Sequence, residues 1–468
     1  MSSADSSLSD RPRISVVVPV YNGERTLAQT LRSLQESNRK PDEVIVVDDG
    51  STDRSVEIAR SFGVTILSTH GRQGPATARS LGAEEATGEI LLFLDSDVAV
   101  HPGTESLPGT VERIGRVFEE QASVAAVFGS YDTEPPEPNF VSQWKNLTHH
   151  FVHHRGHSAA QTFWSGCGAI RKTVFDDAGG FDLSFRGATI EDIELGYRLR
   201  KRGHRILLDP KILCTHAKRW TAWTAWKTDL FYRGIPWTRL ILRTGIVPDD
   251  LNVSVGQRFS TVFAWMMVLA FAYAALALPV ASLAGMVLFV LLLTQAWWME
   301  PPSHGPKVLR WLVPLGMFGT AIATSVYFGL LLFSICLMMG LALAFLFRRR
   351  PSNVRSRAED VCYALYFGFG LLALVADLPP DRSILLASIL ALLLLGLNQN
   401  YYAYLAHHRG VAFMMAVLPF QFVYHFMNGV SLIAGTALTL RESPGLVFRR
   451  HGSTAANADH VPSPRTEA

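Results

Sequence analysis

The chain is predicted to fold as an α/β domain with a mostly parallel, doubly wound sheet, followed by an α-helical transmembrane domain. Between residues 13 and 95, short β-branched apolar runs alternate with helix-like segments, which is the pattern of a parallel sheet covered by helices on both faces. Residues 259–299 and 311–347 contain no Asp, Glu, Lys or Arg, and about 20 apolar residues suffice for one helical pass. With 49% hydrophobic and 18% charged residues among 468, the chain is neither disordered nor a disulfide scaffold.

Four strands and three helices are expected at the start of this domain. The strands are short apolar runs of the kind that is buried in parallel sheets. The third helix opens with Pro75 near its first turn, where proline is favoured. In order, we expect a disordered lead (1–12), a strand (15–20), a helix (24–35), a strand (43–49), a helix (51–62), a strand (64–68), a helix (75–86) and a strand (89–95).

Acidic and aromatic residues follow three of the expected strands. Ligands of doubly wound sheets bind beyond the carboxyl ends of the strands, so we expect a site at this edge. The residues at these strand ends are Pro19 and Tyr21 after the first strand, Asp48 and Asp49 after the second, and Asp95 and Asp97 after the fourth.

Asp95 and Asp97 are candidate metal ligands. Two carboxylates this close repel each other unless a cation lies between them, and oxygen ligands favour Mg²⁺ or Mn²⁺. The alternative is a solvated acidic turn. At the neighbouring strand end, Asp48 can accept a hydrogen bond from a uracil or guanine N–H, and Tyr21 can stack on the base.

Two further segments of the domain carry candidate residues. The loop from Gly71 to Pro75 leads into a helix that carries Arg79, and a glycine-rich helix start favours anions, although its spacing is that of neither a Walker loop nor a dinucleotide fingerprint. Glu191 and Asp192 begin a second helix. Acidic residues in a first turn suit the helix dipole, and the alternative is that one of them is a general base.

The segment that precedes the apolar runs is strongly basic. Residues 195–245 contain 12 Lys and Arg against two acidic residues, whereas residues 1–190 contain 17 basic and 25 acidic residues. Tryptophans recur every three residues from Trp220 to Trp226. We therefore expect residues 219–258 to form an amphipathic helix in the membrane interface, the alternative being a helix packed on the domain's own core. No nucleic-acid module is visible, so nucleic acid is not expected as a partner.

The apolar region from residue 259 to 440 is expected to cross the membrane six or seven times. Basic clusters at 307–310, 348–357 and Arg409 fall on the cytoplasmic side if the α/β domain is cytoplasmic. Residues 411–440, which contain Pro419, are either a seventh pass or a re-entrant hairpin, and residues 441–468 are expected to be a disordered tail.

The polar N-terminus does not resemble a signal peptide, and the four cysteines (Cys167, Cys214, Cys336 and Cys362) lack CxxC spacing, so neither a zinc site nor a disulfide framework is predicted.

Taken together, the motifs of residues 13–216 resemble the family-2 glycosyltransferases, which are inverting enzymes of the GT-A fold. The resemblance covers the domain in the family's order. The matching stretches are SVVVPVYNGERTL, DEVIVVDDGSTD, GPATARSLGA, ILLFLDSD, WSGCGAIRKTVF, GGFD and EDIELGYRLRKRGH. The resemblance implies a catalytic domain at residues 13–218.

This resemblance also implies a role for each candidate residue. Tyr21 and Asp48 would hold the nucleotide base, and Arg79 would lie near the base and the diphosphate. Asp192 would be the catalytic base, with Glu191 as its neighbour. The remaining implied sets are Pro19, Glu24, Asp49 and Asp95 in donor binding, Asp95 and Asp97 in the metal and diphosphate motif, and Cys167 and Gly168 on the acceptor side.

The sequence HAKRW (216–220) resembles the Q-x-x-R-W element of processive polysaccharide synthases. That resemblance implies that Arg219 and Trp220 contact the acceptor. The first position is His216 instead of Gln, which favours a third metal ligand over processive synthesis.

The function that follows from the resemblance is metal-dependent, inverting sugar transfer at a membrane. The donor would be a UDP- or GDP-linked sugar, the cofactor Mg²⁺ or Mn²⁺, and the acceptor a lipid, a lipid-linked intermediate or an envelope glycan. The expected location is the inner or plasma membrane. The alternatives are a processive polysaccharide synthase and an inactive nucleotide-binding scaffold or transporter, although the apolar runs carry few of the charges that transport pathways tend to have.

Overall fold

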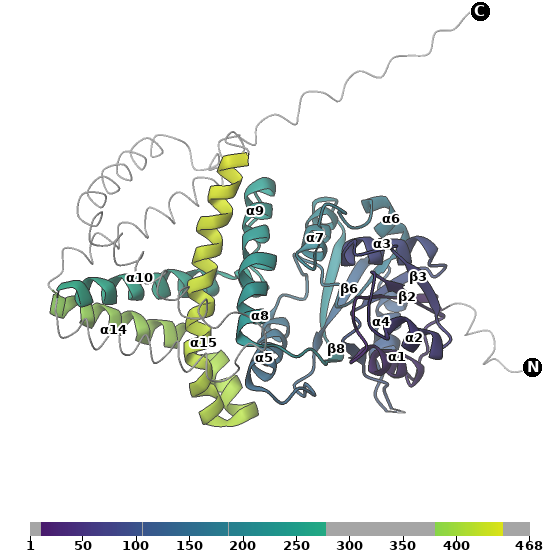
Figure 1. Cartoon of the computed structure of the whole chain (residues 1–468), viewed down its shortest axis with the longest axis horizontal. Helices are drawn as coiled ribbons and strands as arrows, with labels where there is room; N and C mark the ends of the chain where they lie inside the picture. Colours follow the sequence, from purple (N-terminus) through teal and green to yellow (C-terminus); the bar gives the residue numbers. More distant parts are fainter. Residues whose placement is uncertain (1–10, 105, 186, 278–379, 443–468) are drawn as a thin grey trace, which may run out of the picture.

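The computed structural model describes residues 11–104, 106–185, 187–277 and 380–442 (Figure 1). The expectations for residues 1–10, for the basic clusters at 307–310 and 348–357, for Cys336 and Cys362, and for the tail after residue 442 lie outside these ranges.

A single eight-stranded sheet forms the centre of the N-terminal domain, in the order β3-β2-β1-β4-β7-β6-β8-β5. All seven residues of β1 are buried, as expected of a strand in the middle of a covered sheet. The strands are β1 (Ile14–Val20), β2 (Glu43–Asp48), β3 (Thr65–Ser68), β4 (Ile90–Leu94), β5 (Val98–Val100), β6 (Val124–Tyr131), β7 (Cys167–Arg171) and β8 (Arg205–His216).

The sheet is mixed, which differs from a simple doubly wound sheet. The expected strands β1 to β4 are parallel neighbours. β7 is antiparallel to both β4 and β6, and β5 is antiparallel to β8. The apolar pattern of a strand carries no information about its direction, so the sequence could not predict this reversal.

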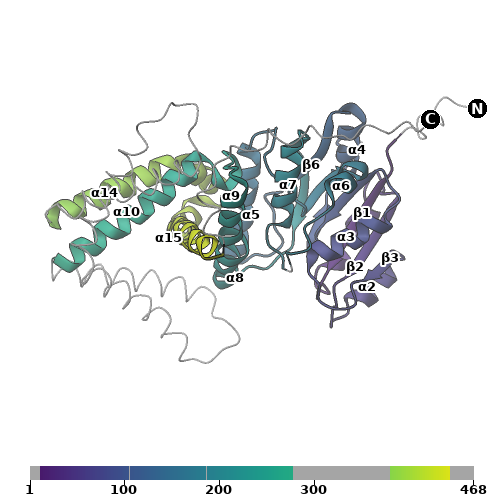
Figure 2. The same cartoon turned by 90° about the horizontal axis from the view of Figure 1, so that it is seen from above.

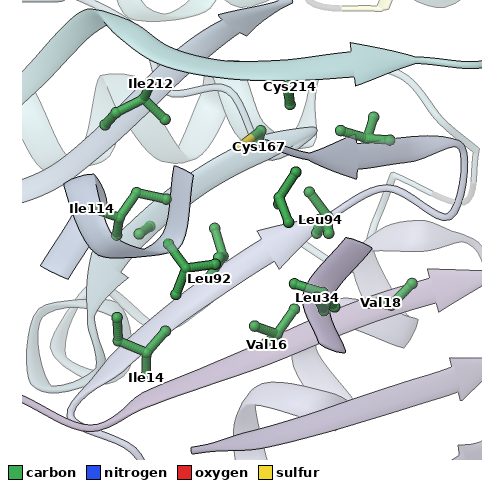
Figure 3. Packing of buried hydrophobic residues seen from close by; sticks show 14 of the residues in the cluster. Ile14, Val16, Val18, Leu34, Leu92, Leu94, Ile114, Cys167, Ile212 and Cys214 are labelled. Carbon is green, nitrogen blue, oxygen red and sulfur yellow. The ribbon is translucent and has the colours of Figure 1, made fainter. Parts of the chain in front are cut away.

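Helices cover both faces of the sheet. Alternate residues of β1 point to opposite faces. Val16 and Val18 pack with α1, α2 and α4, whereas Val17 packs with α3, α6 and α7. Figure 3 shows the first of these clusters, in which Leu34 of α1 and Ile114 of α4 lie over strand residues. The helices of the domain are α1 (Leu27–Gln35), α2 (Ser55–Ser61), α3 (Pro75–Glu85), α4 (Thr110–Glu120), α5 (Phe140–Arg155), α6 (Lys172–Ala178) and α7 (Glu191–Lys201).

A run of helices follows the sheet and lies to one side of it (Figure 1). The long helices α10 and α14 lie side by side in both views, and α15 crosses near their ends (Figure 2). The elements are α8 (Ala222–Lys227), a π-helical turn (Thr228–Gly234), α9 (Ile235–Thr244), a 3₁₀ turn (Leu251–Val253), α10 (Val255–Ala277), α14 (Pro380–Leu397) and α15 (Gln399–Glu442).

The tryptophans of the basic segment pack differently from the expected interfacial helix. Trp220 precedes α8 and is buried with Trp144 of α5 and Phe420 of α15. Trp237 is also buried, and its Nε1–H donates to the hydroxyl of Tyr197 at 2.9 Å. Trp223 remains 62% exposed. The three-residue spacing therefore does not make one lipid-facing stripe, because helices α5 and α15 cover part of it.

Two helices among the described residues are long and apolar enough to cross a membrane: Val255–Tyr273 and Gln399–Glu442. The apolar part of α14, Ser383–Leu397, is shorter than these two helices. Gly410 has non-helical dihedral angles and interrupts α15, whereas the helix continues through Pro419 without the turn of a re-entrant hairpin. The six or seven passes stay a prediction.

Candidate active site

The loops that follow β1 and β2 are tied to each other. Asn22 adopts a left-handed conformation (φ 51°), which asparagine tolerates, and its backbone N–H donates to Ser51 Oγ at 3.0 Å. The N–H of Thr52 donates in return to Asn22 Oδ1 at 2.8 Å. Asp48 accepts from the N–H of Ser51 at 3.0 Å. These contacts hold the ends of both strands at one edge of the sheet.

Asp49 is occupied by the glycine-rich loop. Its carboxylate accepts from the hydroxyl of Thr69 at 2.8 Å, from the N–H of Gln73 at 2.7 Å and from the N–H of Gly74 at 2.9 Å. Gly50 beside it has φ +82°, and a Cβ there would lie 3.0 Å from the backbone of Gly71. Asp49 was expected to contact the donor directly. The structure places its carboxylate on the loop, where it is only 5% exposed, so its direct contact with a donor stays a prediction.

Tyr21 remains accessible at the end of β1. Its ring is 39% exposed, and the guanidinium of Arg72 lies 4.3 Å from the ring centroid. The other two candidates after this strand are less available. Pro19 is buried in β1 opposite Val47, and Glu24 accepts from the N–H of Arg54 at 3.1 Å.

Arg79 connects the end of β4 to the start of α7. One of its terminal nitrogens lies 2.7 Å from Asp95 Oδ1 and the other 2.9 Å from Glu191 Oε1. Burial opposes its charge, but the charges of Asp95 and Glu191 raise its pKa. Burial also raises the pKa of Glu191, even with Arg79 beside it. Sequence analysis named Arg79, Asp95 and Glu191 as candidates. It did not predict that Arg79 forms ion pairs with both carboxylates.

Asp97 and His216 lie near each other, although they are far apart in the sequence. His216 Nε2 is 3.7 Å from Asp97 Oδ1, because β5 and β8 pair at this point. The imidazole stacks on Tyr131 at 4.2 Å, and burial lowers its pKa to about 3, with Lys218 adding to the effect. His216 is therefore neutral at ordinary pH, as a metal ligand must be. No cluster of three or more His, Cys, Asp or Glu with metal-site geometry occurs among the described residues.

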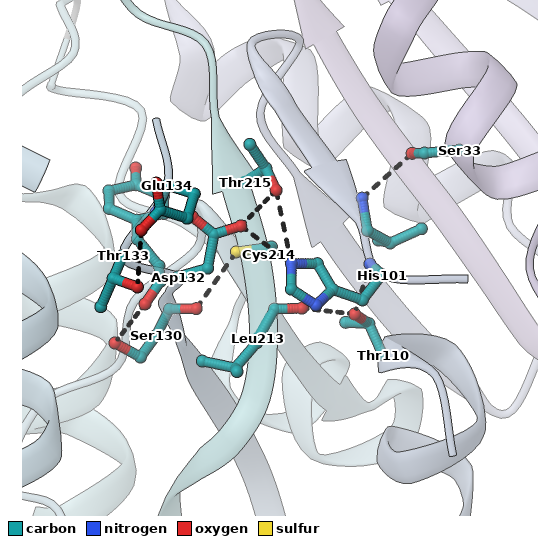
Figure 4. A network of polar contacts seen from close by, with 12 residues as sticks. Ser33, His101, Thr110, Ser130, Asp132, Thr133, Glu134, Leu213, Cys214 and Thr215 are labelled. Atoms are coloured by element: carbon teal, nitrogen blue, oxygen red, sulfur yellow. Dashed lines mark hydrogen bonds and ion pairs between the residues drawn. The ribbon is translucent and has the colours of Figure 1, made fainter. Parts of the chain in front are cut away.

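A polar network supports the strand ends that carry Tyr131 and His216 (Figure 4). Asp132 receives a hydrogen bond from the hydroxyl of Thr215, and its Oδ2 lies 2.9 Å from His101 Nε2. Burial opposes the charge of Asp132, but these two hydrogen bonds lower its pKa. Sequence reasoning missed this network, because its members come from three separate strand ends.

Asp192 is oriented by the turn before β7. Its Oδ2 accepts from the N–H of Ser165 at 3.0 Å and from the hydroxyl of Ser165 at 3.1 Å. Its Oδ1 accepts from the N–H of Ile193 at 2.8 Å. Ser165 belongs to the WSGCG sequence, which explains why a small hydrogen-bonding residue stands there.

The residues expected on the acceptor side are not all accessible. Cys167 is fully buried in the sheet opposite Leu94, and a Cβ at Gly168 would lie 2.1 Å from the carbonyl oxygen of Trp164. Neither residue offers a side chain to an acceptor, which corrects the sequence-based expectation. The N–H of Trp220 donates to Ser142 Oγ at 2.7 Å, and Arg219 is exposed, 3.9 Å from Glu137.

A cavity of about 930 Å³ extends from this site toward the apolar helices. Asp95, Tyr131, Trp164 and His216 line the end at the sheet. Residues of α5, the π-helical turn, α10 and α15 line the remainder. Sequence reasoning missed α5, although its apolar positions Val141, Trp144, Leu147 and Phe151 have helical spacing.

Comparison with known proteins indicates the class of this site. Residues 15–179 match the model of glycosyl transferase family 2. An uncharacterised glycosyltransferase of Haemophilus influenzae is 28% identical over 44% of this chain and 69% of its own length. A validoxylamine A glucosyltransferase of Streptomyces hygroscopicus subsp. limoneus is 30% identical over 41% of this chain and 49% of its own length. A pre-mycofactocin glycosyltransferase of Mycobacterium tuberculosis is 30% identical over 44% of this chain and 43% of its own length.

The solved structures that resemble this chain include a mannosyltransferase from Pyrobaculum calidifontis in complex with GDP-Man and Mn²⁺. It is 19% identical, covers 78% of this chain and 87% of its own, and has a TM-score of 0.38. The chain spans 36% and 69% of the length of two uncharacterised glycosyltransferases of Haemophilus influenzae. These matches show that residues 15–179 are similar to the catalytic domains of family-2 glycosyltransferases.

Proposed function

We propose that the enzyme transfers a sugar, with inversion, from a nucleotide-diphospho-sugar to an amphipathic acceptor at a membrane. The observation that carries this proposal is the bridge made by Arg79. It brings Asp95, which ends a sheet strand, next to the helix that begins with Glu191 and Asp192. A donor-binding carboxylate and a candidate base thereby share one site.

The donor nucleotide would bind at the ends of β1 and β2. Tyr21 is exposed there and can stack on the base, and Arg72 already lies against its ring. Asp48 would accept from a base N–H. The loop held by Asp49 leads into α3, whose start would face the diphosphate. A UDP- or GDP-linked donor fits this arrangement, since uracil and guanine both present N–H groups.

The donor atoms near the strand ends are of the types that bind a divalent cation, although the described residues are not gathered into a three-ligand cluster in this structure. Asp95, Asp97 and a neutral His216 combine carboxylate oxygen with imidazole nitrogen, a set that suits Mn²⁺ and, through the carboxylates, Mg²⁺. Arg79 donates to Oδ1 of Asp95, and Asp95 and Asp97 would be the carboxylates that hold a cation. A bound metal would offset the charge that develops on the leaving diphosphate.

Asp192 would act as the general base. It would accept the proton of the acceptor hydroxyl while the hydroxyl oxygen bonds to the anomeric carbon and the bond to the diphosphate breaks. Attack opposite the leaving group inverts the anomeric centre. The hydrogen bonds from Ser165 would fix the carboxylate toward the acceptor, and such positioned bases contribute about 10²–10⁴-fold to a rate.

A membrane location is supported by the two apolar helices that follow the domain. We propose that the enzyme is bound to the inner or plasma membrane with its α/β domain on the cytoplasmic side, where the basic segment 195–245 would lie. Lipids, lipid-linked intermediates and envelope glycans are acceptors that such a location would supply.

The experiment that tests this function is donor turnover by the purified full-length protein. A panel of nucleotide sugars is incubated with Mn²⁺, with Mg²⁺ or with excess chelator, and release of nucleoside diphosphate is measured. We expect release from one UDP- or GDP-sugar and its loss with chelator. His216→Ala should require more Mn²⁺ for half-maximal activity, because the site loses a ligand. Release from no donor would contradict the proposal, and full activity in chelator would contradict its metal.

A further inference from the structure

The cavity next to the active site joins two chemically different regions. At one end it contacts Asp95 and His216. At the other end it is lined by Trp265 and Met266 of α10 and by Leu432 of α15. These two helices are the ones long and apolar enough to span a membrane. A ligand that fills this cavity would therefore be polar near the carboxylates and apolar at the far end.

Positive charge gathers in the polar part of the cavity. Lys145 is already paired, with its ammonium 2.8 and 2.9 Å from the two oxygens of Asp229. Lys218, Arg233 and Arg258 also line the cavity. The guanidinium of Arg258 donates to the carbonyl oxygens of Val253 and Pro248, whereas in the described part of the chain no carboxylate lies within 4.0 Å of Lys218 or Arg233. The ammonium of Lys218 is 4.6 Å from the ring centroid of Trp220. Two cations are thus available to an anionic ligand.

Arg233 has a distinctive backbone position. It lies in the π-helical turn Thr228–Gly234, and such turns occur mostly as local insertions at functional sites. The next residue, Gly234, packs closely on α15, since a Cβ there would lie 2.2 Å from Ser431 Oγ. The backbone next to Arg233 is therefore held against α15.

We propose that the cavity binds a phosphate-bearing lipid as the sugar acceptor. Its phosphate would contact Lys218 and Arg233, its hydrocarbon chain would lie along α10 and α15, and its head group would extend toward Asp95 and His216. Charge-assisted contacts to phosphate are strong and directional for arginine, so the phosphate would select the acceptor and set its orientation. This inference rests on the proposed function and narrows its acceptor class.

Direct binding to the detergent-solubilised full-length protein tests the proposal without a donor. Three probes are titrated: phosphatidylglycerol, diacylglycerol with the same acyl chains, and glycerol 3-phosphate, with binding measured by native mass spectrometry. Phosphatidylglycerol should bind at least about tenfold more tightly than either of the others, because only it has phosphate, hydroxyls and chains together. Equal binding of diacylglycerol would overturn the role of phosphate. Equal binding of glycerol 3-phosphate would overturn the role of the chain.

Variants assign the binding to the two cations. Arg233→Gln and Lys218→Gln should each weaken phosphatidylglycerol by about tenfold and leave diacylglycerol unchanged. Lys227→Gln removes the same charge six residues from Arg233, outside the cavity lining, and should change neither. Arg233→Lys keeps the positive charge and should retain most of the phosphatidylglycerol affinity, which separates loss of charge from misfolding. Unchanged phosphatidylglycerol affinity in both Gln variants overturns the proposal. Nucleotide release is measured separately, so failure of the transferase and failure of this lipid site are told apart.

Discussion

At the scale of single residues, Arg79 has the largest influence on the site. It is 5% exposed and compensates two carboxylates that belong to different elements. Glu191, which is 4% exposed, depends on it for its counter-charge. A buried carboxylate without a partner is costly, so Arg79 stabilises the fold and also sets the positions of Asp95 and α7.

Replacing Arg79 should therefore affect stability and donor binding together. We expect Arg79→Gln to lower the free energy of unfolding by about 3–5 kcal/mol, the usual cost of breaking a buried ion pair. Denaturant unfolding and donor affinity are measured on the same preparation. Arg60→Gln is the control, because Arg60 is an exposed residue in the last turn of α2, and it should behave like the wild type. An Arg79→Gln protein with wild-type stability would show that the bridge is not formed.

Asp192 and Glu191 show how far residue types alone can lead. The acidic pair at the start of a helix predicted a candidate base, and the structure places Asp192 on Ser165 and Glu191 on Arg79. Only the resemblance implied which of the two is the base. Their partners could not be predicted, since both partners come from distant parts of the sequence. Cys167 was misplaced for the same reason: its direction depends on the antiparallel β7.

At the scale of elements, the loop between β3 and α3 depends on one carboxylate. Asp49 accepts three hydrogen bonds from Thr69, Gln73 and Gly74, and the last two donors are backbone groups of the loop. The loop carries Arg72, which contacts Tyr21. The order of this loop and the orientation of the proposed base platform are thus linked.

Asp49→Asn should loosen the loop. The amide nitrogen that replaces one oxygen cannot accept from a backbone N–H, and an unsatisfied buried donor costs about 1–3 kcal/mol. We expect a lower unfolding temperature and a raised KM for the donor with a smaller change in kcat, measured by steady-state kinetics. Glu57→Gln is the control, because Glu57 is an exposed residue of α2 outside the loop. A donor KM equal to that of the wild type would contradict this role of Asp49.

The elements that could be predicted are those with a local signature. The strands β1 to β4 were marked by apolar runs and by polar residues at their ends, and they form as expected. The spacing of the Trp-rich segment fits either lipid or protein contact. In the structure Trp220 is buried against α5 and α15, whereas Trp223 is 62% exposed. Helices α5 and α15 are themselves joined, since the Nε1–H of Trp144 donates to the hydroxyl of Tyr401 at 3.0 Å. Such a contact between residues 257 positions apart leaves no local trace.

At the scale of the whole molecule, α5 joins the sheet to the apolar helices. Its buried face packs with Trp220 and with Tyr401 and Phe420 of α15. On the side toward the sheet, His153 is buried, and its Nδ1 lies 2.8 Å from the carbonyl oxygen of Gly129. Burial lowers the pKa of His153 to about 4. A neutral histidine is therefore buried where α5 packs between the sheet and the apolar helices.

This buried histidine should make the fold sensitive to acid. In the unfolded chain His153 binds a proton below about pH 6.5, whereas in the folded chain it does so only near pH 4. The stability that neutral His153 contributes to the fold is therefore complete above about pH 6.5 and is lost toward pH 4. The slope is about 1.4 kcal/mol per pH unit for one such group. Unfolding is measured from pH 7.5 to 4.5. His153→Asn should flatten the profile by this amount, whereas the exposed His70→Asn should keep the wild-type slope. An unchanged slope in His153→Asn would contradict the assignment.

The most direct test of the central claim compares transfer and donor binding in Asp192→Asn. The amide keeps the shape of the side chain and loses the ability to accept a proton. If Asp192 is the base of a sugar transferase, kcat should fall by about 10²-fold or more while the Kd for the nucleotide sugar stays within about twofold. Asp182→Asn, at an exposed position before α7, is the matched control and should leave both unchanged. A variant that transfers sugar at the wild-type rate, or that loses donor affinity instead of rate, would contradict the account.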